Sequence, residues 1–251
     1  VSLYFDDLPP AFDGYRIVQF TDLHAGSVEA EVLERTTETI NSLDADAVVF
    51  TGDLQNMLPD ELRHYGRELS SLKAKDGVFS VLGNHDYSLY VKADTSACNA
   101  NERRLIALER GYGWGLLMNE HRVIRRGSDS IVIAGEENGG KAPFPKKSDL
   151  KKTLAGVSSD AFIVLLQHDP SAWRRYILPC SDVRLTLSGH THGGQISMFG
   201  YRPTQLSGTE DSGLYREGNH FLYVSTGVGG LVPFRFGVTP EIVVLTLHKI
   251  K

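Results

Sequence analysis

Side chains that can bind metal ions follow five separate apolar segments of this chain of 251 residues. Each segment is rich in Val, Ile, Leu or Phe, and a short polar block comes directly after it. The blocks are Thr21-Asp22-Leu23-His24, Thr51-Gly52-Asp53, Gly83-Asn84-His85-Asp86, Gln167-His168 and Ser188-Gly189-His190-Thr191-His192. A single His after a strand is usually a structural residue, and Gly-Asp alone is usually a turn. Five such blocks in one chain indicate one shared metal site more strongly than five unrelated turns.

The donors in these blocks are too many for one tetrahedral ion, which needs about four ligands. They are Asp22, His24, Asp53, Asn84, His168, His190 and His192. These donors suffice for two ions if one carboxylate binds both, and we expect Asp53 to bridge because it follows a central strand. Imidazole, carboxylate and amide ligands without a thiolate suit Mn, Fe or Zn. Two such ions about 3.5–4 Å apart activate a bridging water and hold phosphate oxygens, so the pattern predicts phosphoester hydrolysis.

The elements that must position the first three blocks are short strands alternating with helices. Segments 1–5, 15–20, 45–50 and 77–82 are β-rich, and the last two are continuous apolar runs typical of strands buried on both faces. Segments 29–42 and 58–72 have the apolar spacing of helices. This alternation predicts a mostly parallel sheet covered by helices, in which ligands collect beyond the carboxyl ends of the strands.

The second half of the chain predicts a second sheet. Strands are expected at 131–134, 162–166, 183–187, 221–224 and 241–247, and helices at 101–110 and 148–155. The Gly- and Pro-rich stretch 193–218 is expected to be mostly loop. Because no low-complexity linker divides the chain, the two β-rich halves indicate two sheets packed together with helices outside.

The five blocks, in this order, resemble those of the calcineurin-like metallophosphoesterase superfamily, and the resemblance covers nearly the whole chain. The longer motifs DLHAG, GHTHGGQI and STGVGG are similar to those of a bacterial subgroup, the YkuE/YaeI-like phosphodiesterases. The resemblance implies an α/β fold, a four-layer α/β/β/α sandwich of two mixed sheets flanked by helices. It also implies that residues 1–251 are a single metallophosphoesterase domain with a dinuclear site at the strand ends.

The resemblance also assigns roles to the residues of the site. It places Asp22, His24 and His192 on one ion, and Asn84, His168 and His190 on the other, with Asp53 between them. It implies that His85 protonates the leaving oxygen and that Asp86 orients His85. A protonated imidazole lowers the barrier for an alkoxide leaving group, and a nearby carboxylate raises the pKa of a His. The alternative is that His85 only forms a hydrogen bond with phosphate or backbone.

The expected substrate is a small or lipid-like phosphoester, either a monoester or a diester. Protein phosphatases of this superfamily follow Gly-Asp with a variable pair and then Asp-Arg-Gly, and they carry Gly-Asn-His-Glu; here Gly52-Asp53 is followed by Leu54-Gln55-Asn56, and Asp86 replaces the Glu. A phosphoprotein is therefore disfavoured. The formal charge of −5 gives no reason to expect nucleic acid as a partner. A superfamily nuclease and a non-catalytic metal-binding scaffold are the alternatives.

A membrane-associated or exported protein in a bacterium is the expected localisation. The chain begins at Val1 directly before a strand, and members of the subgroup it resembles often have an upstream membrane or export segment. Six apolar residues close to the ligand blocks are expected to flank the site or to belong to the core. They are Leu54, Met57, Tyr87, Tyr90, Met198 and Phe199. Arg235 is expected to form a structural ion pair or to touch a substrate phosphate.

Overall fold

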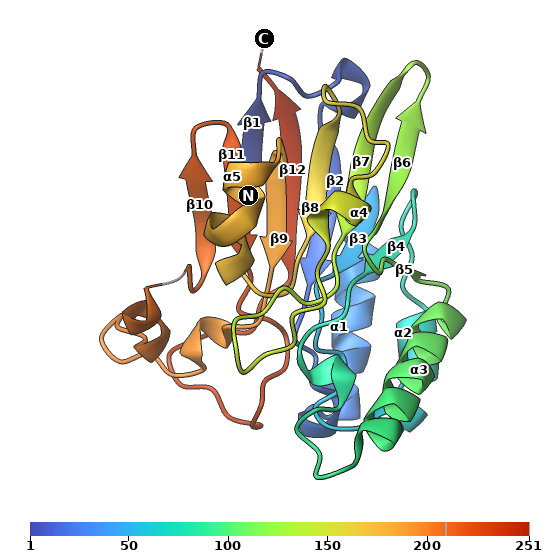
Figure 1. Ribbon diagram of the computed structural model, residues 1–251, viewed down its shortest axis with the longest axis vertical. Coiled ribbons are helices and arrows are strands. Elements are labelled where there is room, and N and C mark those ends of the chain that lie inside the picture. Colours follow the sequence, from blue (N-terminus) through green and yellow to red (C-terminus); the bar gives the residue numbers. More distant parts are fainter. Residues whose placement is uncertain (209, 251) are drawn as a thin grey trace.

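Two six-stranded sheets pack face to face in the computed structural model, which describes residues 1–208 and 210–250 (Figure 1). The first sheet has the order β1-β12-β2-β3-β4-β5. Its strands are β1 (Ser2–Phe5), β12 (Val243–Lys249), β2 (Tyr15–Phe20), β3 (Ala47–Phe50), β4 (Val78–Ser80) and β5 (Gly115–Leu116). Strands β2 to β5 are parallel, whereas β12 is antiparallel to β2. The sheet is therefore mixed.

The second sheet has the order β10-β11-β9-β8-β7-β6. Its strands are β10 (Gly213–Glu217), β11 (His220–Val224), β9 (Leu185–Ser188), β8 (Phe162–Leu166), β7 (Asp129–Gly135) and β6 (Glu120–Arg126). The four inner strands are parallel, and the two edge strands are antiparallel to their neighbours. In both sheets the parallel strands end at the same side of the molecule.

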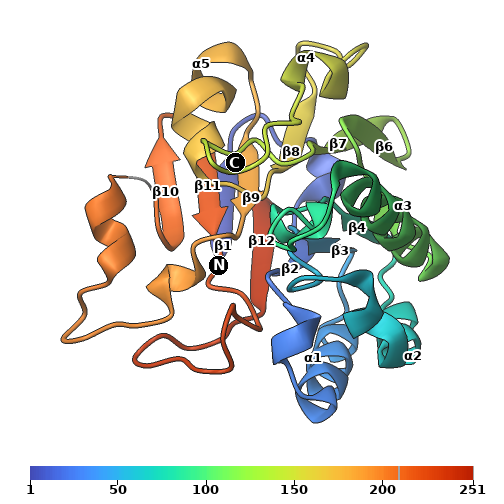
Figure 2. The ribbon, with the colours of Figure 1, turned by 60° about the horizontal axis from the view of Figure 1, so that its bottom comes forward.

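Helices cover the outer face of each sheet (Figures 1 and 2). The first sheet is covered by α1 (Ala30–Ser42), α2 (Gly66–Ser70) and α3 (Thr95–Gly111). The second is covered by α4 (Leu150–Thr153), by the π-helical segment Trp173–Ile177 and by α5 (Leu178–Cys180). The predicted four-layer α/β/β/α sandwich is confirmed.

The inner strands β3 and β8 are apolar throughout because both of their faces are buried. In β2, Ile17 points into the core between the two sheets, and its neighbour Val18 points to the helices. Val49 and Phe50 of β3 divide in the same way. Burying a side chain of this size contributes about 1.5–3 kcal/mol. A one-residue shift in register would exchange the two faces, so this packing fixes where each strand ends and its ligand block begins.

Several predicted elements differ from the structure. The helix expected at 58–72 is a 3₁₀ helix, Pro59–His64, followed by the short α2, and the helix expected at 148–155 is reduced to α4. Strand β6 was not predicted, and β10 lies inside the stretch expected to be loop. Both are edge strands that carry charged residues on an exposed face, so they lack the continuous apolar pattern of a buried strand. No described helix is long and apolar enough to cross a membrane.

Candidate metal centre

All five polar blocks lie together at the carboxyl ends of β2, β3, β4, β8 and β9, as predicted. The first sheet supplies Asp22, His24, Asp53 and Asn84, and the second supplies His168, His190 and His192. Six of these seven side chains are buried, and His190 is half-buried. Such a concentration of buried carboxylate and imidazole groups is costly unless a charge partner is present.

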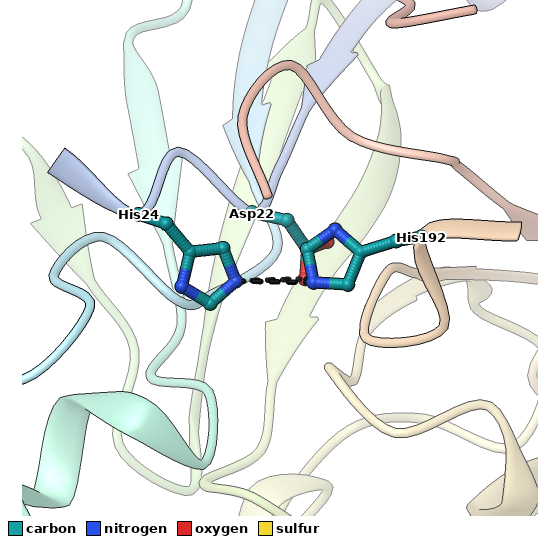
Figure 3. Close-up of side chains that lie close together, drawn as sticks. All are labelled: Asp22, His24 and His192. Carbon is teal, nitrogen blue, oxygen red and sulfur yellow. Dashed lines mark hydrogen bonds and ion pairs between the residues drawn. The ribbon is translucent and has the colours of Figure 1, made fainter. Parts of the chain in front are cut away.

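One group of donors consists of Asp22, His24 and His192 (Figure 3). The Nε2 atoms of the two imidazoles are 3.1 Å apart. Asp22 Oδ1 lies 3.4 Å from His192 Nε2 and 3.9 Å from His24 Nε2. The Asp22 carboxylate also accepts hydrogen bonds from the backbone N–H of His190. Asp22 therefore has a fixed orientation, with one oxygen toward both rings.

A second group forms around Asn84. Its Oδ1 lies 2.7 Å from His190 Nδ1 and 3.1 Å from His168 Nε2. The other nitrogen of His168, Nδ1, is 2.7 Å from the Thr51 carbonyl, to which only an N–H can donate. This contact places a proton on Nδ1 and turns Nε2 toward the other donors, as is usual for a metal-binding His.

Asp53 lies between the two groups. Its Oδ2 is 3.1 Å from His168 Nε2 and 3.7 Å from His24 Nε2. Its Oδ1 accepts a hydrogen bond of 2.8 Å from the backbone N–H of His85. One carboxylate oxygen thus faces both groups while the other holds the side chain in place.

Five of the seven donors have a left-handed backbone, which is uncommon for residues other than glycine. Their φ angles are positive: Asp22 (53°), His24 (47°), Asp53 (60°), His190 (74°) and His192 (52°). Such conformations cost of order 1–3 kcal/mol each and persist at functional sites where the surroundings impose them. With this backbone conformation the donor side chains lie close together just beyond the strand ends.

Two glycines allow the carboxylates to approach the backbone. A Cβ atom at Gly83 would lie 2.2 Å from Asp53 Oδ1, and one at Gly189 would lie 2.1 Å from Asp22 Oδ2. No side chain can be accommodated at these distances without moving the carboxylate. The close packing of the two carboxylates therefore requires glycine at positions 83 and 189.

The electrostatics of the donors suit divalent metal ions. Burial lowers the pKa of His24 to about 3, so its imidazole is neutral and has a lone pair to give. Burial also disfavours charge on His168, but the Asp53 carboxylate outweighs it and raises the pKa of His168 to about 10. The buried Asp53 carboxylate thus stabilises a positive charge placed next to it. Its oxygen and nitrogen donors fit Mn, Fe or Zn.

His85 lies beside the donors but is held differently. Its Nδ1 donates to the Asn56 carbonyl at 2.6 Å, so the proton is on Nδ1 and Nε2 is free to exchange a proton. Its ring meets that of His24 edge to face, with 4.8 Å between centroids. His85 also lines the pocket that Asp53 and Asn84 line, a position that suits an acid–base residue.

Asp86, which the sequence analysis expects to orient His85, has other hydrogen-bond partners in the structure. Both oxygens of Asp86 accept hydrogen bonds from backbone N–H groups, those of Asp53, Leu54, Gln55 and Gly83. Burial raises the pKa of Asp86 to about 7. Among the described residues, Asp86 forms no hydrogen bond with the ring of His85. Asp86 instead fixes the loop after β3 against the loop after β4. The backbone carbonyl of Asn56, rather than Asp86, orients the ring of His85.

Tyr90 lies at the site, and no sequence motif indicates the contacts that it forms there. Its hydroxyl accepts a hydrogen bond of 2.8 Å from Asn84 Nδ2, and its ring lies 4.4 Å from the ring of His85. The hydrogen bond turns the amide of Asn84 so that Oδ1 points at the two His of its group. By contrast, Leu54 and Tyr87, expected either to flank the site or to be core, are core residues.

A pocket of about 340 Å³ opens onto the donors. The pocket is lined by Asp53, Asn84, His85, His190 and His192, and by residues far from them in the sequence. The others that matter here are Lys141, Phe144, Ser171, Thr204 and Leu231. Phe144 meets His190 edge to face at 4.8 Å. These residues lie outside the metal-binding blocks, so the sequence alone did not indicate them.

Arg235 forms no ion pair among the described residues, so the structural ion pair expected from the sequence is absent there. Its guanidinium donates to the carbonyls of Thr226, Gly227 and Gly229. Burial lowers its pKa. Arg235 thus holds together the loop after β11, whose Gly227 packs against Asp22.

Known proteins with similar sequences are phosphoesterases or carry such a domain. The chain is 32% identical to the metallophosphoesterase YkuE of Bacillus subtilis, over 96% of this chain and 82% of that protein. It is 31% identical to the UDP-2,3-diacylglucosamine pyrophosphatase LpxG of Chlamydia trachomatis, over 94% of this chain and 85% of that protein. A transmembrane protein with a metallophosphoesterase domain from Danio rerio is 31% identical over 99% of this chain, which spans only 56% of that protein.

Solved structures share the fold at low sequence identity. The NAD nucleotidase of Haemophilus influenzae has a TM-score of 0.52 at 14% identity, over 85% of this chain and 45% of that one. The phosphopantetheinyl hydrolase of Mycobacterium tuberculosis has a TM-score of 0.50 at 12% identity, over 88% and 91% of the two chains. The calcineurin-like phosphoesterase family model matches residues 15–194, which include all five ligand blocks. This chain therefore belongs to the calcineurin-like phosphoesterase family and is a metal-dependent phosphoesterase.

Proposed function

We propose that the protein is a dinuclear phosphoester hydrolase that acts on a small or lipid-like monoester or diester. The observation that carries the proposal is the position of Asp53 Oδ2, which faces His168 Nε2 at 3.1 Å and His24 Nε2 at 3.7 Å. A carboxylate oxygen placed between two sets of donors is suited to bind two ions at once. We also propose that residues 1–251 form one domain, because both sheets contribute to this site.

Each ion in this proposal is held by residues of both sheets. The first takes Asp22, His24 and His192, the second Asn84, His168 and His190, and Asp53 belongs to both. Two bound divalent ions supply an activated water and positive charge for the phosphate oxygens. The protein supplies the fixed orientation, through the Thr51 carbonyl behind His168 and the His85 N–H behind Asp53.

His85 is proposed to give a proton to the leaving oxygen. Its ring orientation is fixed by the Asn56 carbonyl at Nδ1 and by Tyr90 against one face. With Nδ1 committed, a second proton on Nε2 can pass to an oxygen in front of the donors. This transfer assists departure of an alkoxide, whose pKa is high, more than that of a phenolate.

The pocket supports a small head group rather than a phosphoprotein or a duplex. Its volume of about 340 Å³ is at the small end for ligand pockets. Lys141 gives it an exposed cation beside the donors for substrate phosphate. The substrate named for LpxG, a diacylated sugar nucleotide, supports a lipid-like phosphoester.

A matrix of metals and substrates tests the proposal. The metal-free chain receives Mn²⁺, Zn²⁺, Fe²⁺ or Mg²⁺ and is assayed on p-nitrophenyl phosphate, bis-p-nitrophenyl phosphate, nucleotides and glycerophosphodiesters. We expect metal-dependent hydrolysis of at least one ester, lost in Asp53→Asn purified in parallel. Absence of hydrolysis with every metal supports the scaffold alternative, and cleavage of DNA or RNA in preference to small esters supports the nuclease alternative.

We further propose that the protein acts at a membrane. The name of the Danio rerio relative, a transmembrane protein, supports this, since nearly all of this chain aligns with it. Fractionation of cells that express the full-length gene tests the location. Recovery of the protein entirely in the soluble fraction would contradict it.

A further inference from the structure

Nine exposed apolar side chains gather on two loops beside the metal centre. One loop follows the last ligand block and the other follows β11. The residues are Ile196, Met198, Phe199, Tyr201, Leu206, Leu231, Val232, Phe234 and Phe236, and we call them the apolar surface. Phe199 is 97% exposed and Leu206 is 91% exposed. Isolated exposed apolar residues are ordinary, but a cluster of this size marks an interaction site.

The two loops form one unit. A β-bridge joins Ile196 to Phe236, and the N–H of Ser197 donates to the Phe236 carbonyl at 2.7 Å. Figures 1 and 2 show both loops, in orange and red-brown, projecting from the same end of the molecule. Pocket-like hollows of about 390 Å³ and about 310 Å³ lie along them, lined mostly by apolar residues.

The apolar surface is tied directly to the metal centre. Gln195, buried three residues after His192, donates its side-chain amide to the carbonyls of Val232 and Phe234 and accepts from the N–H of Leu231. Leu231 also lines the pocket that holds the donors. A molecule resting on this surface therefore borders the mouth of the active site.

The charge of the two loops indicates what kind of partner they fit. Residues 195–206 and 226–240 contain no Asp, Glu or Lys, although 23% of the whole chain is charged. Their only charged residues are Arg202, paired with Asp211 at 2.6 Å, and Arg235, bonded to backbone carbonyls. Glu29, which lines the hollow of about 310 Å³, is exposed and lies outside these loops. The loops themselves carry no unpartnered charge, so little charge has to be desolvated when they enter an apolar phase.

We propose that the apolar surface inserts into a lipid surface and brings the metal centre to a phosphoester anchored there by acyl chains. The inference rests on the proposed hydrolase function and names the physical form of its substrate. Strongly exposed apolar side chains such as Phe199 and Leu206 can enter the boundary between head groups and acyl chains. The acyl part then remains in the lipid while the head group reaches the pocket.

Sedimentation with phosphatidylcholine vesicles tests the binding without any turnover. The wild-type chain is expected to sediment with the vesicles, and Phe199→Asp/Leu206→Asp to bind at least about tenfold more weakly, because both changes place charge in the apolar phase. Val123→Asp is the matched control: Val123 is 43% exposed on β6, away from the two loops, and this variant should bind as the wild type does.

Activity measurements separate this inference from the proposed function. The double variant is expected to hydrolyse a water-soluble p-nitrophenyl ester within about twofold of the wild type, and to lose at least about tenfold on a phosphoester presented in mixed micelles. Vesicle binding without hydrolysis of any ester would contradict the proposed function alone. Wild-type protein that stays in the supernatant, or a double variant that binds vesicles equally well, would overturn the inference. So would light scattering that finds a wild-type dimer and a monomeric double variant, since a second copy then covers the surface.

Discussion

Asp53 differs from the other six donors because both groups of ligands depend on its position. Its Oδ2 faces both groups, and its charge offsets that of both ions in the proposed site. Asp53→Asn should therefore reduce kcat by about 10³-fold or more, since loss of several kcal/mol of charge stabilisation corresponds to a factor of ten for each 1.36 kcal/mol. Asp22→Asn, which affects one group only, should reduce kcat less. Near-normal turnover of Asp53→Asn at saturating Mn²⁺ excludes the bridging role.

The contribution of His85 to kcat is predicted to increase with the basicity of the leaving group. His85→Asn should lower kcat by about 10²–10⁴-fold for an alkyl ester and much less for a p-nitrophenyl ester, since p-nitrophenolate departs without a proton. Both metals should stay bound, because the group of donors is complete without His85. Steady-state rates on a paired series of esters, with metal content by elemental analysis, check this. An equal loss for both leaving groups would show that His85 is not the acid.

Tyr90 is predicted to act through Asn84. Without the hydroxyl, Asn84 Nδ2 loses its 2.8 Å acceptor, and the amide can turn its nitrogen toward the two His. Tyr90→Phe should weaken binding of one metal by about 10–100-fold, as for other residues that orient ligands, while the phenyl ring still packs on His85. Isothermal titration calorimetry with the metal measures this affinity. Tyr201→Phe, at an exposed residue of the apolar surface, serves as the control. Equal metal affinity in Tyr90→Phe and wild type would contradict this role.

At the scale of the elements, the turn after β9 must bring backbone and carboxylate together. A Cβ at Gly189 would lie 2.1 Å from Asp22 Oδ2 and 2.4 Å from Thr21 Oγ1. Gly189→Ala should therefore displace Asp22 and reduce bound metal from two ions toward one, with loss of most activity. Gly111→Ala, where a Cβ meets nothing within 4 Å, should retain both ions. Elemental analysis of the two variants after dialysis against Mn²⁺ distinguishes them, and equal metal content would contradict the packing argument.

The buried elements could be predicted from sequence because two-sided burial leaves a continuous apolar run, as in Val48, Val49 and Phe50. Edge strands β6 and β10 could not, since their exposed faces carry charges such as Arg122 and Arg216. The donors of the site were predictable because strand ends meet at one edge of a sheet. The role of Asp86 was not, because its partners are backbone N–H groups that any residue supplies. Asn56 acts through its carbonyl, which carries no sequence signal either.

At the scale of the whole molecule, the proposed ions connect the two sheets. In that proposal Asp22 and His24 of the first sheet would hold one ion together with His192 of the second, and Asn84 of the first would hold the other together with His168 of the second. The core between the sheets holds them by apolar contacts such as Phe5 against Phe162, 4.9 Å between ring centroids. Metal removal therefore leaves the sheets packed, but with buried carboxylates and imidazoles facing one another across the join.

Removal of metal is consequently predicted to destabilise the whole domain rather than one loop. An ion at a thousand times its Kd stabilises the native state by about 4 kcal/mol, and in a domain of this size each kcal/mol shifts Tm by about 2–4 °C. Dialysis against EDTA should thus lower Tm by at least about 8 °C in a single transition, and Mn²⁺ should restore it at two ions per chain. Asp53→Asn should show less than half of this shift, because neither group of donors is complete without the shared carboxylate. Calorimetry with parallel elemental analysis decides the matter: an unchanged Tm in EDTA, or saturation at one ion per chain, would mean that the two sheets are not joined by a dinuclear centre.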